Sequence, residues 1–340
     1  MPAPAPSQTP SLRKNESHDQ TRKALAAVAV AAISTLTFAQ SFALVSSEKD
    51  NALTIVNLKD QKVEGTIPTC KRPRHLQLTP DRKQVLAACG DDNTADVIDV
   101  ATRKSVGRIP LGKEPEAFDI SPDGRTLYVS NEDEGELSFV DIATKKVTHV
   151  VKVGKEPEGV KVSADGKTVY VSSEVASMVH VIDVATAKVV KNIATGKRPR
   201  RFALTPDGAE LWVTNELGSS VSIISTKEMA VIGTVKFAIK GAKVADITPV
   251  GITMTRDGKR AFVGLGKGNH VAFVDVAKRE VTHQVLAGKR AWNVTLNKDE
   301  SQLYVINGMS DDMTIIDVAS AKATKTVPVG RVPYGAVLID

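Results

Sequence analysis

Residues 113–154 read KEPEAFDISPDGRTLYVSNEDEGELSFVDIATKKVTHVVKVG, and the next 42 residues, 155–196, nearly repeat them as KEPEGVKVSADGKTVYVSSEVASMVHVIDVATAKVVKNIATG. In the first copy, alternating apolar and polar positions predict an innermost strand over 117–121. Further strands are predicted over 126–130, 136–141 and 146–153. One repeat therefore predicts one small four-stranded sheet.

Counting the repeats predicts how the sheets are assembled. A Lys-x-Pro turn, or its replacement, marks repeats that begin at 71, 113, 155, 197, 247, 289 and 331. Residues 43–70 match only the last three strands of a unit, and residues 331–340 match only its first strand. Pairing these two ends completes one sheet and removes exposed sheet edges. The chain is predicted to be an all-β, seven-bladed β-propeller closed by its C-terminal and N-terminal strands.

The amino-terminal segment predicts export. Arg22 and Lys23 precede an apolar run over 24–38, and Thr37-Phe38-Ala39 has the small-x-small pattern of a cleavage site. We expect residues 1–39 to be a disordered leader plus signal peptide, and 40–340 to be a periplasmic propeller domain without a membrane span. An uncleaved anchor and a start site downstream of Met1 remain alternatives.

The two faces of the ring differ in sequence. Turns of the type Ser121–Gly124 and Asp141–Lys146 recur almost unchanged and open on one side, which we call the uniform face. The opposite side, the variable face, carries the Lys-x-Pro crossings between blades and the loops between second and third strands. Localised function is expected on the variable face. An eight-residue insertion within 236–244 also falls there and suits an interaction loop or a lid.

Second strands such as Tyr128-Val129-Ser130-Asn131 and Trp212-Val213-Thr214-Asn215 resemble the YVTN repeat of bacterial and archaeal propellers. The resemblance covers about residues 43–340. The export signal, the seven units and Ser47-Glu48-Lys49-Asp50-Asn51 further resemble exported YVTN propellers associated with PQQ-dependent alcohol catabolism. That resemblance implies an accessory component without established catalytic residues. A PQQ-holding quinoprotein would have eight blades with tryptophan motifs, and a c-type cytochrome would have Cys-x-x-Cys-His; the sequence shows neither.

Two cysteines interrupt the repeat at neighbouring positions. Cys70 stands where Gly112 and Gly154 stand in other units, and Cys89 stands where Asn131 stands. In an oxidising compartment this placement predicts a disulfide, with two unpaired buried thiols as the alternative.

The remaining composition narrows the chemistry. The six histidines are scattered, and only His75 lies on an innermost strand at the variable end, so no metal site is predicted. No strained nucleophile turn is visible, and no catalytic residue is predicted. With aromatics at 4% and a formal charge of +6, nucleic acid is not an expected partner.

One residue per blade follows the crossing proline and is expected to ring the mouth of the central channel. This set is Arg74, Glu116, Glu158, Arg200, Val250, Trp292 and Tyr334, with His75, Arg201, Arg290 and Asn293 close by. Guanidinium groups beside two aromatics could hold a planar polycarboxylate such as PQQ. The alternatives are solvated turns that make inter-blade salt bridges, and a surface for a partner protein.

The sequence as a whole favours a monomeric, non-enzymatic binding or scaffold protein accessory to PQQ-dependent alcohol oxidation. Its partner would be a periplasmic dehydrogenase, a cytochrome c or a transporter component, or else a small anionic ligand. No cofactor is predicted, although PQQ is a candidate ligand. The alternative is an enzyme or enzyme subunit, either a lactonase-like hydrolase or a quinoprotein oxidoreductase subunit, that uses the channel mouth.

Overall fold

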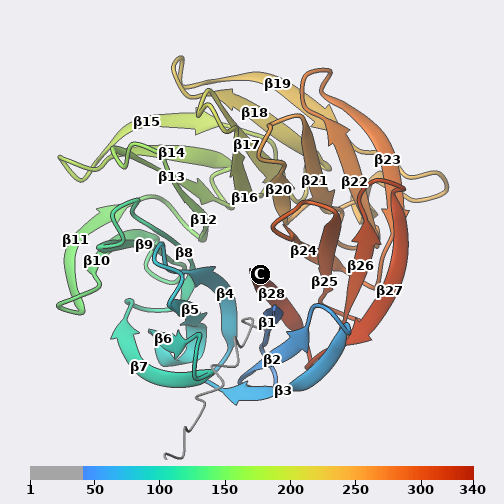
Figure 1. The fold of residues 1–340 in the computed structure, drawn as a ribbon. Helices are drawn as coiled ribbons and strands as arrows, with labels where there is room; N and C mark the ends of the chain where they lie inside the picture. Colours follow the sequence, from blue (N-terminus) through green and yellow to red (C-terminus); the bar gives the residue numbers. More distant parts are fainter. Residues whose placement is uncertain (1–40) are drawn as a thin grey trace, which may run out of the picture. The chain divides into compact units, whose positions relative to one another are not determined.

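The computed structural model describes residues 41–340, so the predicted leader and cleavage site lie outside the described residues. The described part is a closed ring of seven antiparallel sheets with four strands each (Figure 1). The innermost strands surround the axis and the outermost strands form the rim. Among the described residues, no helix is long and apolar enough to cross a membrane.

Six sheets each take four consecutive strands, which run in chain order from the axis to the rim. The first three are β4 (Pro73–Leu78), β5 (Gln84–Cys89), β6 (Thr94–Asp99) and β7 (Lys104–Pro110); β8 (Pro115–Ile120), β9 (Thr126–Asn131), β10 (Glu136–Asp141) and β11 (Lys146–Lys152); and β12 (Pro157–Val162), β13 (Thr168–Ser173), β14 (Met178–Asp183) and β15 (Lys188–Ala194). The next three are β16 (Pro199–Leu204), β17 (Glu210–Asn215), β18 (Ser220–Ser225) and β19 (Ala230–Lys236); β20 (Ile252–Met254), β21 (Arg260–Gly264), β22 (His270–Asp275) and β23 (Glu280–Leu286); and β24 (Ala291–Leu296), β25 (Gln302–Asn307), β26 (Asp312–Asp317) and β27 (Lys322–Pro328). Two single 3₁₀ turns, η1 (Gly90–Asp92) and η2 (Val244–Asp246), lie in loops of the variable face.

The seventh sheet joins the two ends of the ring. Its order is β28 (Pro333–Ile339), β1 (Phe42–Ser47), β2 (Ala52–Asn57) and β3 (Lys62–Pro68). Phe42 pairs with Ile339, and Ser47 pairs with Pro333. This pairing confirms the predicted closure and the count of seven blades.

The core lies between neighbouring sheets, and the second strands explain why. In β9, Leu127 and Val129 pack toward the preceding sheet, while Tyr128 packs toward the following one. A strand buried on both faces reads as a continuous apolar run rather than as strict alternation. The YVTN strands are therefore the interior layer of each blade.

The innermost strands differ slightly from the prediction. β8 begins at Pro115 rather than at 117, because a β-bulge lets Pro115 pair with Asn131 and Ala117 pair with Ser130. The register between the first two strands shifts in the same place in six of the seven sheets. A bulge re-aims a side chain, and here the re-aimed residue is the one after the crossing proline.

The turns of the uniform face are closed by their own side chains. In one, the Ser121 hydroxyl donates to Asp123 and accepts the backbone N–H of Thr126. In the other, Asp141 accepts both the backbone N–H and the hydroxyl of Thr144. These local bonds account for the near-identity of the turns from blade to blade.

Candidate functional site

The mouth residues are held by hydrogen bonds between neighbouring blades. Hydroxyl groups of the YVTN-type strands donate to the carbonyl of the mouth residue of the next blade. The four bonds run from Ser46 to Arg74 (2.7 Å), Ser130 to Glu158 (3.0 Å), Ser172 to Arg200 (2.7 Å) and Thr214 to Val250 (2.7 Å). The Ser or Thr of the motif thus fixes the backbone on which the mouth side chains stand.

The crossings adopt an uncommon backbone conformation. Arg72, Glu114 and Arg290, which precede the proline position, have positive φ values of 55°, 44° and 60°. Their backbone N–H groups donate to side-chain oxygens of Asn51, Asn93 and Asn269 respectively, in loops of the preceding blades. Such left-handed residues persist where surrounding contacts over-determine them. The crossings are therefore rigid supports for the mouth.

The most buried ion pairs lie between the third and fourth repeats, which begin at residues 155 and 197. Arg200, with 4% of its side chain exposed, contacts Glu158 at 2.9 Å, Glu216 at 3.6 Å and also Glu174. Arg198 contacts Glu174 at 2.6 Å and Glu216 at 3.1 Å. Burial raises the pKa of Glu158. The positive charges of Arg200 and Arg201 lower it by more than burial raises it, so the pKa of Glu158 lies below its ordinary value.

A second group of ion pairs connects the closing blade with the next two. Arg74 pairs with Glu116 and, at 3.2 Å, with Glu48. Arg72 pairs with Glu114 at 2.7 Å and Glu116 at 3.4 Å. The crossings therefore make inter-blade salt bridges, as one alternative expected, but the carboxylate of Glu116 is fully buried rather than solvated.

Glu132 adds a third carboxyl group next to Glu114 and Glu116 of this second group. Burial, followed by the charges of Glu116 and Glu158, raises the pKa of Glu132 to about 8. Ligand atoms of Glu114, Glu116 and Glu132 lie within 4.8 Å of one another, a spacing that a metal ion could use. Arg72 and Arg74 already compensate the first two carboxylates, so the group carries no uncompensated charge to attract a cation.

Aromatic residues complete the mouth. Trp292 and Tyr334 pack with Val250 in a buried apolar cluster. The guanidinium groups of Arg290 and Arg74 lie 4.0 Å and 4.5 Å from the ring centroids of Trp292 and Tyr334. Cation–π contacts at these distances attract the guanidinium groups to the rings.

The predicted mouth residues consequently fill the mouth. Glu116, Glu158, Arg200 and Tyr334 are 0%, 2%, 3% and 2% exposed. A planar tricarboxylate such as PQQ does not fit this arrangement, because bidentate capture would require breaking the existing Arg–Glu pairs. Of the mouth arginines, Arg290 has no carboxylate partner within the described residues, and it already stacks on Trp292.

Three of the predicted site residues lie deeper. His75, Arg201 and Asn293 line a cavity of about 180 Å³ within the channel, together with Gln77 and others. Sequence reasoning did not single out Gln77, Asp119 or Lys161 of this cavity. The alternation of the strand could have identified them. Each lies two positions beyond a channel-facing residue on an innermost strand, and residues two apart on a strand face the same side.

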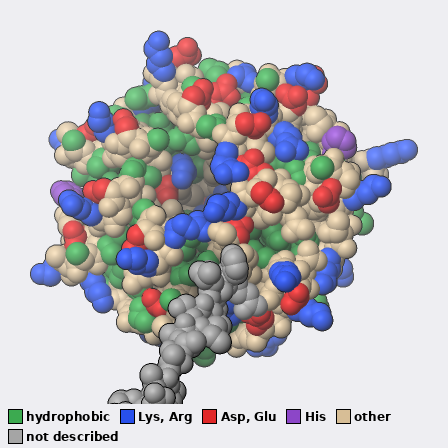
Figure 2. Space-filling model, viewed as in Figure 1, with side chains coloured by type: hydrophobic (Ala, Val, Ile, Leu, Met, Phe, Trp, Pro, Cys, Tyr) green, Lys and Arg blue, Asp and Glu red, His purple; other side chains and the backbone are tan. Residues whose placement is uncertain are grey.

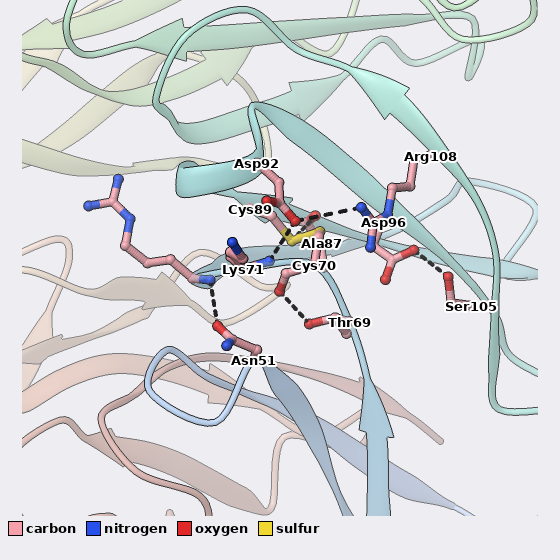
Figure 3. The surroundings of a disulfide bond; sticks show 11 residues. Asn51, Thr69, Cys70, Lys71, Ala87, Cys89, Asp92, Asp96, Ser105 and Arg108 are labelled. Carbon is pink, nitrogen blue, oxygen red and sulfur yellow. Dashed lines mark hydrogen bonds and ion pairs between the residues drawn. A yellow bond between two sulfur atoms is a disulfide. The ribbon is translucent and has the colours of Figure 1, made fainter.

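The disulfide lies at the seam beside the closing blade. Cys70 and Cys89 are bonded, with Cα atoms 5.8 Å apart, and both side chains are buried (Figure 3). Beside the bond, the Lys71 backbone N–H donates to Asp92 at 2.9 Å, and Arg108 pairs with Asp92 at 3.5 Å (Figure 3). The bond ties the crossing after β3 to the end of β5.

The ring of seven four-stranded blades defines the chain as a seven-bladed β-propeller. A family model for the choice-of-anchor I domain matches residues 131–302, and the chain belongs to this family. The family indicates an extracellular or surface protein. No curated protein matches the sequence.

Solved structures share the fold at low sequence identity. A Kuenenia stuttgartiensis hydrazine synthase chain is 23% identical, with a TM-score of 0.73 over 81% of this chain and 92% of that one. The Pseudomonas aeruginosa periplasmic gluconolactonase is 19% identical, with a TM-score of 0.75 over 88% and 99%. A functionally unknown protein from Desulfotomaculum acetoxidans is 17% identical, with a TM-score of 0.75 over 87% and 98%. These similarities establish the propeller fold and no more.

Proposed function

We propose that the protein is a non-enzymatic periplasmic scaffold that docks a partner protein through its variable face. The observation that carries this proposal is a set of exposed apolar side chains on loops and strand ends of four consecutive sheets. They are Val175, Leu217, Val244, Leu286 and Met309, with exposed fractions of 60%, 58%, 63%, 63% and 64%. We infer that these side chains, which lie on the same face of four neighbouring blades, contribute to a protein contact site.

The insertion between β19 and β20 contributes to this face. The hydroxyl of Ser219, in the β17–β18 loop, donates to the carbonyl of Val244 at 2.8 Å, so the insertion lies beside the loop that carries Leu217. Lys240 and Lys243 of the insertion are exposed. The partner surface expected from this sector is acidic and contains apolar pockets.

Charge is segregated across the same face. Asp91 and Asp92 lie in the β5–β6 loop, and Asp133 and Glu134 lie in the β9–β10 loop, opposite the sector with the lysines and apolar groups. A broad dipolar face orients an approaching protein and increases its association rate. Within residues 41–340, the charged side chains at the centre of this face are buried and ion-paired, as Glu116, Glu158 and Arg200 show.

The proposed role is accessory to PQQ-dependent alcohol oxidation, with a periplasmic dehydrogenase, a cytochrome c or a transporter component as the partner. This assignment rests on the resemblance to the exported YVTN propellers. The test is retention of such a component from a periplasmic extract on the immobilised full chain. Leu217→Asp and Met309→Asp should abolish retention. Val106→Asp, on the rim strand β7 where Val106 is 57% exposed, should retain the partner like the wild type.

An enzyme remains the second candidate, because one structural neighbour is named as a periplasmic gluconolactonase. The same preparation can be assayed for hydrolysis of glucono-δ-lactone by continuous titration of released acid. Turnover by the wild type that survives Leu217→Asp and Met309→Asp would contradict a purely scaffolding role.

A further inference from the structure

The channel cavity below the mouth has an unusual supply of unused hydrogen-bonding groups. It measures about 180 Å³ and is walled by innermost strands of six sheets. Six polar residues stand in its wall, namely His75, Gln77, Asp119, Lys161, Arg201 and Asn293.

The carboxylate in this wall is already satisfied. Asp119 accepts hydrogen bonds from Gln77 Nε2 at 2.7 Å and from the backbone N–H groups of Ile120 at 3.0 Å and Val162 at 2.9 Å. Lys161 Nζ pairs with it at 2.9 Å. With four partners, Asp119 has little remaining capacity to accept bonds from a ligand.

Donors in the wall are left over. Lys161 has one ion pair for its three N–H groups, and its side chain is 35% exposed. Asn293 uses its carbonyl oxygen to accept the Val294 N–H at 2.9 Å, and within the described residues its amide N–H groups have no partner. The terminal nitrogens of Arg201 already have partners. They donate to the backbone carbonyl of Glu158 and to the Tyr334 hydroxyl, and one of them pairs with the Glu158 carboxylate. The unused N–H groups of the Lys161 ammonium and the Asn293 amide therefore line one small space, where they can donate to an anionic ligand.

Two further atoms of the wall are buried without a hydrogen-bond partner among the described residues. These are Gln77 Oε1 and His75 Nε2. Burial lowers the pKa of His75 to about 3, so its imidazole is neutral and can donate or accept. A buried polar atom without a partner is costly, and a ligand hydroxyl that donates to Gln77 Oε1 would remove that cost.

We propose that this cavity binds a short-chain hydroxycarboxylate. Its carboxylate would accept hydrogen bonds from Lys161 and Asn293, and its hydroxyl would donate to Gln77. A cavity of about 180 Å³ suits a small ligand, since pockets for drug-sized molecules measure roughly 300–1,000 Å³. This site is independent of partner docking on the variable face.

Access to the cavity is from the uniform face. A second cavity of about 630 Å³ shares Gln77 with the first and extends to Arg82, Arg256 and Lys298 in the turns of that face. In Figure 2, Lys and Arg side chains gather around the hollow at the centre of the face shown. Two carboxylates also line this second cavity, and they pair with its arginines: Arg82 lies 4.0 Å from Asp340, and Arg256 lies 3.2 Å from Glu300.

Isothermal titration of the purified full chain with sodium glycolate and sodium L-lactate tests the proposal. We expect saturable binding that weakens roughly tenfold or more in Lys161→Gln and in Asn293→Asp, which replaces a donor by an isosteric carboxylate. Lys167→Gln is the matched control, because Lys167 is an exposed lysine in the next turn of the same blade. Thermal melts establish that each variant is folded. If only one of Lys161→Gln and Asn293→Asp folds, its affinity is compared with those of the wild type and Lys167→Gln.

Four outcomes of the titrations with small molecules would overturn the proposal. They are no binding by the wild type at millimolar concentrations, equal binding of acetate, which lacks the hydroxyl, equal binding of inorganic phosphate, and equal loss in Lys167→Gln. Binding of PQQ that depends on Lys161 would likewise contradict a site for small ligands. Propane-1,2-diol, which lacks the carboxylate, should not bind.

Discussion

Arg200 joins three carboxylates from three different segments in the interior of the mouth. Its side chain is 4% exposed, while those of Glu158 and Glu174 are 3% and 1% exposed. Replacing it by methionine fills similar space and leaves these carboxylates without their main counter-ion. Breaking a buried ion pair on one side typically costs about 3–5 kcal/mol.

We therefore expect Arg200→Met to lower the free energy of unfolding by about 3–5 kcal/mol. Urea denaturation at neutral pH measures this loss. The control is Arg256→Met, since Arg256 is 71% exposed where it pairs with Glu300. A surface pair of that kind contributes about 0–1 kcal/mol. Equal losses in the two variants would show that burial of the network does not matter.

Glu132 predicts a pH dependence of stability. Its pKa is about 8 in the folded protein against an ordinary value of 4.5, because of burial and then of the neighbouring carboxylates. A raised folded-state pKa means that its favourable contribution is complete below pH 4.5 and is lost as the pH rises toward 8. Solvent screens the half-buried group, so the expected loss is on the order of 1 kcal/mol.

Glu132→Gln should abolish this dependence, because the amide stays neutral at every pH. The melting temperature of the wild type should fall relative to the variant between pH 5 and pH 8, within the window set by 4.5 and about 8. Glu134→Gln, in the same loop but exposed, should melt in parallel with the wild type. Parallel curves for all three proteins would contradict the raised pKa of Glu132.

At the scale of elements, the disulfide reinforces the crossing where the ring closes. Cys70 and Cys89 are separated by 19 residues, a span that contains β4 and most of β5. Closing a loop of this length reduces the entropy of the unfolded chain, by about 3 kcal/mol in the chain-entropy account. The bond also fixes the backbone directly before Arg72 and Arg74.

The double variant Cys70→Ser, Cys89→Ser should therefore unfold about 2–4 kcal/mol more easily than the oxidised wild type. Chemical denaturation with and without reductant measures the difference, and reductant should have no effect on the variant. A wild type whose stability is unchanged by full reduction under denaturing and refolding conditions would exclude a stabilising role for the bond.

The elements also show what sequence can and cannot predict. Strand positions and both uniform turns followed from the repeat because their hydrogen bonds are local, as between Ser121 and Asp123. The bulge at Pro115 was missed because it depends on pairing with Asn131 across the sheet. The register of the repeat predicted the positions of the mouth residues but did not predict that they are buried. Their burial depends on carboxylates in the loops, such as Glu174 and Glu216, and the repeat does not align these loop positions with the crossings.

At the scale of the whole molecule, each blade repeats the same unit, so closure does not depend on which unit is interrupted. Phe42 pairs with Ile339, which brings the two ends of the ring side by side. The turn between β12 and β13, which includes Asp165 and Gly166, is equivalent to the natural break, because it too separates a first strand from the other three. A chain cut there would close its ring with the same one-plus-three sheet.

We expect a circular permutant of residues 41–340, with the native ends linked and new ends between Asp165 and Gly166, to fold into a monomeric ring. Deleting residues 332–340 instead should abolish cooperative unfolding, because β1 would lose its inner partner and the channel would lose Tyr334. Circular dichroism melts and size-exclusion chromatography distinguish the two results. A truncated chain that melts as cooperatively as the permutant would mean that closure by β28 is dispensable, and that the ion-paired mouth alone holds the ring together.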